Sequence, residues 1–123
     1  RLDETLASIR FIAPEDLEGA AQCPSTENVT YGVTPGNPVK VGGGSLAGPA
    51  RERAYLDNLT DSGGNPVSYE RVGSRETSPG IIDEFRITMD GNVYPLFLDQ
   101  YMFDFPMAPQ GFFCLGMFPL GQP

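Results

Sequence analysis

The sequence predicts a small α+β protein, built from an antiparallel β-meander of three or more strands, one main packed helix and long loops rich in glycine and proline. Three observations lead to this class. The chain has 123 residues, of which 40% are hydrophobic, so it suits one domain with a real core. Polar and apolar residues alternate through much of its second half. Its 15 glycines and 12 prolines require many turns.

We expect one domain over residues 1–123, divided into three parts. Residues 1–30 form an acidic N-terminal arm, 31–102 an α+β core, and 103–123 an aromatic tail rich in proline and glycine. Apolar residues recur at helical spacing near the start of the arm and predict a short amphipathic helix over 1–12. The rest of the arm is acidic, which favours a solvated segment.

The main helix is expected to begin at Gly48-Pro49, because proline suits the first helical position. It should run to about Leu59, with Tyr55, Leu56 and Leu59 on its buried side. The charged residues of the same segment are expected to lie mostly in water: Arg51, Glu52, Arg53 and Asp57.

Strands are expected on both sides of this helix. A short one spans 38–41, and alternation resumes from Asn65 and is plainest over 81–89. The Asp90-Gly91 pair predicts a tight turn into a returning strand over 93–102. Pro95 has no amide proton, so it predicts a sheet edge or a bulge at that position.

The charge balance excludes two classes of partner. The chain has 16 acidic and 8 basic residues and a net charge of −8, so it repels phosphate backbones and anionic headgroups. We therefore expect no nucleic-acid partner. No apolar run approaches the roughly 20 residues of a membrane helix, so the chain as given is not expected to span a bilayer.

Residues suited to catalysis are scarce. There is no histidine, so the commonest general base and metal ligand is missing, and we expect no enzyme, no cofactor and no metal. Asp83 and Asp99 fall on the apolar sides of their strands, where they either pair with an arginine such as Arg71 or bind a cation. Ion pairing is favoured, because the chain lacks the ladder of Asp, Asn and Gly found in calcium loops.

The two cysteines, Cys23 and Cys114, are expected to form a disulfide. Their even number, in an acidic, loop-rich chain that starts at Arg1 without methionine, favours an exported and processed protein. Closing so long a loop contributes about 4 kcal/mol in the chain-entropy model.

The tail concentrates aromatic side chains and has no charged residue after Asp104. It either folds over the protein's own core or lies against a partner, since contiguous exposed apolar surface marks interaction sites. The candidate partner-binding residues are Phe103, Phe105, Phe112, Phe113 and Phe118.

An ordered set of motifs over about 31–112 resembles a family of small uncharacterised bacterial envelope proteins, often made with a signal or lipoprotein leader. The motifs are NPVKVGG at 37–43, GPARERAYL at 48–56, YERVGS at 69–74, IDEF at 82–85, FLDQY at 97–101 and PQGF at 109–112. This chain departs from the family at Arg75 and Glu76, where members often have adjacent cysteines. The resemblance implies a periplasmic or envelope location and the fold, and supplies no catalytic residues.

Together these observations lead to two expectations of function. The first is an accessory subunit, without catalytic activity, on the periplasmic face of a membrane protein complex such as a photosynthetic or respiratory one. The second is a periplasmic carrier of a small molecule or cation, with a site that involves Arg71, Asp83 and Asp99.

Overall fold

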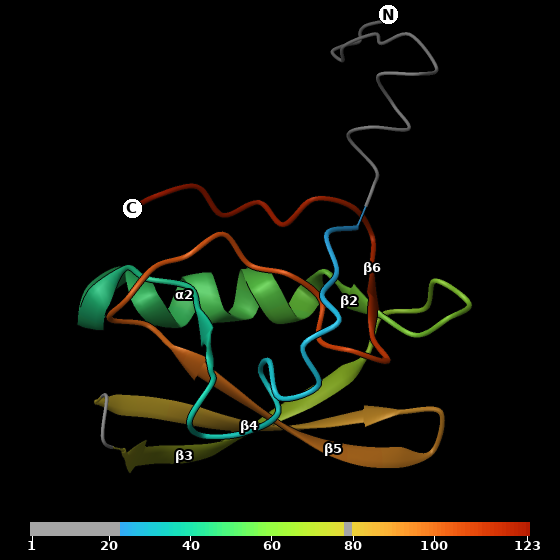
Figure 1. Ribbon diagram of the computed structural model, residues 1–123, viewed down its shortest axis with the longest axis horizontal. Coiled ribbons are helices and arrows are strands. Elements are labelled where there is room, and N and C mark those ends of the chain that lie inside the picture. The colour runs from blue at the N-terminus through green and yellow to red at the C-terminus, as the bar shows by residue number, and fades with distance from the viewer. Residues whose placement is uncertain (1–22, 78–79) are drawn as a thin grey trace, which may run out of the picture.

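The computed structural model describes residues 23–77 and 80–123 and has the predicted small α+β fold (Figure 1). The predicted helix over 1–12 lies outside the described residues. The elements, in chain order, are β1 (Val39–Lys40), α2 (Gly44–Asp57), β2 (Leu59–Thr60), β3 (Ser68–Glu76), β4 (Ile81–Met89), β5 (Asn92–Asp99) and β6 (Phe113–Cys114).

The main sheet has the strand order β1-β5-β4-β3. β3, β4 and β5 form the expected antiparallel meander, and β1 joins it in parallel at one end, where it pairs only with Leu98 and Asp99. Pro95 therefore lies on a stretch of β5 that β1 does not reach, which agrees with the predicted edge. A second, two-stranded sheet joins β2 to β6 in antiparallel pairing.

The turn between β4 and β5 is the predicted one. Asp90 and Gly91 have φ of 54° and 78°, and Met89 pairs with Asn92 directly across the turn. Two successive positive φ angles match the right-handed twist of a tight hairpin, and Asp-Gly tolerates them well. The returning strand is shorter than expected, because it ends at Asp99 and not at Met102.

The helix begins earlier than predicted, at Gly44, and ends at Asp57, so Pro49 lies inside it. Contacts with other segments hold the N-terminal half of the helix. The Gly44 amide donates to the Gln100 carbonyl (2.7 Å), and Arg51 Nε donates to the Val41 carbonyl (2.7 Å). These contacts extend the helix before the proline, which sequence propensity alone does not anticipate.

The core lies between α2 and the meander and includes part of the C-terminal segment, residues 103–123. In Figure 1 this segment runs along the side of α2 that faces away from the sheet. Tyr55 stacks on Phe118 with ring centroids 4.6 Å apart, and Tyr94 meets Phe112 edge to face at 5.8 Å. Residues of the segment thus belong to the same core as the helix and the strands: Ala108, Phe112, Phe118 and Leu120.

Candidate functional site

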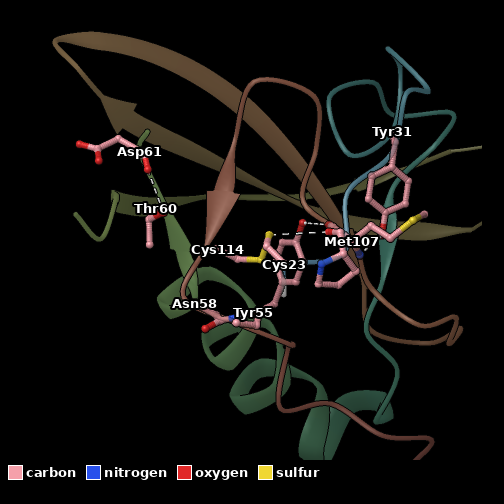
Figure 2. The surroundings of a disulfide bond; sticks show 10 residues. Cys23, Tyr31, Tyr55, Asn58, Thr60, Asp61, Met107 and Cys114 are labelled. Carbon is pink, nitrogen blue, oxygen red and sulfur yellow. Dashed lines mark hydrogen bonds between the residues drawn. A yellow bond between two sulfur atoms is a disulfide. The ribbon is translucent and has the colours of Figure 1, made fainter. Parts of the chain in front are cut away.

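The disulfide between Cys23 and Cys114 is present, with Cα atoms 5.3 Å apart. Figure 2 shows that the same region is tied by Met107, whose amide donates to the Tyr31 hydroxyl (3.0 Å) and whose carbonyl accepts from the Tyr55 hydroxyl (2.7 Å). The disulfide and these two hydrogen bonds therefore join three parts of the chain in one region: the N-terminal end of the described residues, the helix and the C-terminal segment.

A bulge in β3 builds a polar cluster on the face of the sheet that α2 covers. Arg71 pairs with Phe85, but the next paired residue is Gly73, opposite Glu84, so the register shifts by one. The shift places Ser74 opposite Asp83, on the same face as Arg71, because side chains otherwise alternate between faces.

Asp83 accepts hydrogen bonds from both of these β3 side chains through Oδ1. Ser74 Oγ lies 2.6 Å from it and Arg71 Nη2 3.1 Å. Burial alone raises the pKa of Asp83, but hydrogen bonds from Glu52, Ser74 and Arg71 outweigh it and hold this pKa below its ordinary value. The expected ion pair of Arg71 with Asp83 is present, and Asp83 is ionised at neutral pH.

Asp99 does not join this pair. Its Oδ1 accepts the amides of Tyr101 (2.8 Å) and Met102 (3.1 Å) and so caps the turn after β5. The residue is 5% exposed. Of the three residues grouped from the sequence, the structure thus brings two into contact and gives the third a local structural role.

Glu52 is the functional candidate that the sequence analysis missed. It was expected to lie mostly in water, yet it is 2% exposed, and no donor among the described residues bonds its Oε2. Burial, and then hydrogen bonding to Asp83, raises the pKa of Glu52 to about 9, so its carboxyl is protonated at neutral pH and donates to Asp83. Helical spacing contained the signal, because Glu52 precedes the buried Tyr55 and Leu56 by three and four positions.

A cavity of about 370 Å³ lies between α2 and the sheet, over this cluster. Its volume is near the lower end of the range for small-molecule pockets. The residues that line it are Pro49, Glu52, Arg53, Tyr69, Glu70, Arg71, Ser74, Asp83, Phe85 and Gln100.

A second cleft, of about 630 Å³, is apolar and belongs to the C-terminal segment. Among the described residues that line it, only Asp104 is charged. The others are Pro24, Phe105, Pro106, Met107, Met117, Phe118, Pro119, Leu120 and Gly121. Phe105 and Met117 are 68% and 62% exposed, so the cleft opens onto an apolar surface.

The five phenylalanines grouped as partner-binding therefore divide. Phe112 and Phe118 are buried in the protein's own core and are not available to a partner, because the tail packs against α2 and the meander. Phe105 and Phe113 are exposed. Phe103 is partly buried, with its ring edge to face with Phe105 (5.2 Å) and beneath the Arg51 guanidinium (5.6 Å).

Residues 23–77 and 80–123 contain no group of three or more His, Cys, Asp or Glu side chains that could hold a metal ion. The same residues form no helix long and apolar enough to cross a membrane. Comparisons with family models, with curated proteins and with solved structures found no match.

Proposed function

We propose that this protein is an exported accessory subunit, without catalytic activity, that docks onto a membrane protein complex through its apolar cleft. The observation that supports this most is Phe105, an aromatic side chain that is 68% exposed at the wall of an apolar cleft. Aromatic and methionine side chains are enriched at the centres of protein interfaces, and each aromatic can bury about 150–250 Å².

The shape of the cleft suits docking. Three of its lining residues are prolines, Pro24, Pro106 and Pro119, whose restricted backbone loses little conformational freedom when a partner binds. The Cys23–Cys114 bond adjoins Pro24 and fixes that wall. The surface is therefore largely formed before the partner arrives.

The partner's chemistry follows from charge. This chain has a net charge of −8, and the cleft has one carboxylate, Asp104. A protein that inserts an aliphatic or aromatic side chain, framed by lysine or arginine, complements both the apolar centre and the acidic surroundings. A periplasmic location agrees with the disulfide, which persists in oxidising compartments.

The proposal is tested by replacing Phe105 and Met117 with aspartate and following co-migration with membrane complexes after mild detergent extraction. The wild-type protein should travel with one defined large assembly, and the double variant should be released from it with its melting temperature nearly unchanged. Val93→Asp is the matched control, because Val93 is similarly exposed (58%) on the β-hairpin, away from the cleft. The control should remain bound.

Four results would contradict this function. The double variant remains in the assembly, or the Val93→Asp control is released equally. In the third case a second copy of the protein fills the cleft, and sedimentation then shows that the wild-type protein dimerises and the double variant does not. In the fourth case a lipid fills the cleft, and organic extraction of the purified protein reveals it.

A further inference from the structure

The apolar cleft of the C-terminal segment lies where the N-terminal segment, residues 1–22, joins the described chain. Pro24 lines the cleft, and only Cys23 separates it from the N-terminal segment. Two bonds fix this junction: Cys23 is bonded to Cys114, and the Pro24 carbonyl accepts the Ala108 amide (2.8 Å). In Figure 1 the blue start of the described chain accordingly lies beside the red C-terminal segment. The N-terminal segment is therefore attached at a wall of the cleft.

The N-terminal segment has the sequence pattern of an apolar face. Leu2, Leu6 and Ile9 recur at helical spacing, which predicts the amphipathic helix over 1–12. Such a helix is about 18 Å long at 1.5 Å per residue. The residues that follow it, 13–22, can span up to about 33–36 Å when extended. This length is enough to bring the apolar face onto a cleft of about 630 Å³ whose wall is the attachment point.

Charge also suits this segment to the cleft. Residues 1–12 have two basic and two acidic side chains, whose charges cancel, whereas the whole chain has a net charge of −8. Arg10 directly follows Ile9. The cleft has the carboxylate of Asp104 beside its apolar lining, and an apolar side chain next to an arginine complements both.

We propose that the apolar face of the N-terminal segment occupies the cleft in the free protein, and that a partner has to displace it in order to dock. The displacement rests on the proposed function, whereas the occupancy does not. A short linker gives a tethered segment an effective concentration of about 1 mM. A contact with a dissociation constant of about 0.1 mM therefore keeps the cleft roughly 90% occupied.

The experiment measures how fast dilute hydrogen peroxide oxidises each methionine of the purified full chain, followed by peptide mass spectrometry. Met117 lines the cleft and Met102 lies outside it, and their exposed fractions are similar, 62% and 51%. An occupied cleft shields Met117, so this residue should be oxidised at least about fivefold more slowly than Met102. Dilution should not change the ratio, because the occupant belongs to the same molecule.

The double variant Leu6→Asp with Ile9→Asp places two charges on the apolar face of the predicted helix. Oxidation of Met117 should then be several-fold faster than in the wild-type protein, because the cleft is vacated. Ala7→Asp with Ser8→Asp is the matched control, since it adds the same charge on the other side of that helix and should keep the slow rate.

The occupancy is overturned if Met117 is oxidised as fast as Met102 in the wild-type protein. It is also overturned if dilution removes the protection, because a second copy then fills the cleft, or if both double variants stay protected, as a bound lipid would cause. The proposed function is tested separately by co-migration, in which Leu6→Asp with Ile9→Asp should bind the assembly at a lower concentration than the wild type. Equal concentrations overturn the displacement. If neither protein co-migrates while the oxidation results hold, the proposed function fails and the occupancy stands.

Discussion

Replacing Glu52 with glutamine should change how the stability of the protein depends on pH. The pKa of Glu52 is about 9 in the folded protein against an ordinary value of 4.5. Between these values the unfolded chain releases a proton that the folded chain keeps, so the wild-type free energy of unfolding falls as pH rises, by at most about 1.4 kcal/mol per unit. Between pH 4.5 and neutral pH the wild-type free energy of unfolding therefore falls by up to about 3 kcal/mol.

Glutamine does not titrate and can still donate to Asp83, so Glu52→Gln should lack this loss. Its free energy of unfolding should exceed the wild-type value by an amount that grows from pH 4.5 and levels off near pH 9. The contribution of Asp83 to the free energy of unfolding changes with pH in the opposite direction. Its pKa is lowered, so its contribution is present above its ordinary 3.8 and is lost as pH falls below it, in both proteins.

Urea denaturation at unit steps from pH 5 to 9 measures the difference directly, with Glu84→Gln as the control for loss of one acidic side chain. Glu84 is in a partly exposed ion pair, so its replacement should change stability by less than about 1 kcal/mol, without this trend. Parallel pH curves for wild type and Glu52→Gln would refute the reasoning, since a carboxyl that stays ionised in the folded state produces no widening gap.

Three further predictions concern the fold. Intact mass after alkylation without reductant should show no modified thiol, and Cys23→Ala with Cys114→Ala should lower the free energy of unfolding by about 4 kcal/mol; two alkylated thiols would exclude the bond. Gly91→Ala should cost about 1 kcal/mol because φ there is 78°, and a neutral effect would argue against the turn. Phe112→Ala should destabilise by about 3–5 kcal/mol while Phe113→Ala, 50% exposed, changes the melting temperature little; equal losses would contradict the burial described.

The parts of the fold that depend on local patterns could be predicted from the sequence. Alternation over 81–89 and the Asp90-Gly91 turn defined the hairpin, because both signals are contained within a few residues. The start of α2 could not be predicted, because it depends on Gln100, which is far away in the chain. The parallel pairing of β1 with β5 depends on the same kind of distant contact.

The candidate site was predicted only in part, for a related reason. Arg71 and Asp83 were grouped correctly, since both lie on strands whose faces can be assigned by alternation. Asp99 was grouped with them, but its side chain caps the following turn. Glu52 was assigned to solvent because it is charged, although its spacing from Tyr55 placed it on the buried face. At Glu52, residue type was given more weight than periodicity, whereas at Asp83 and Asp99 periodicity was followed and both are buried.

The position of the disulfide has a consequence for how the chain matures. Cys23 and Cys114 are separated by 91 positions, and β6, which contains Cys114, pairs with β2 just after the helix. A ribosome adds about 5–20 residues per second, so Cys23 is made about 5–18 s before its partner. Because the chain has only two cysteines, any disulfide that Cys23 forms in that interval joins it to another molecule. Correct closure therefore depends on Cys23 remaining reduced until the last strand is available.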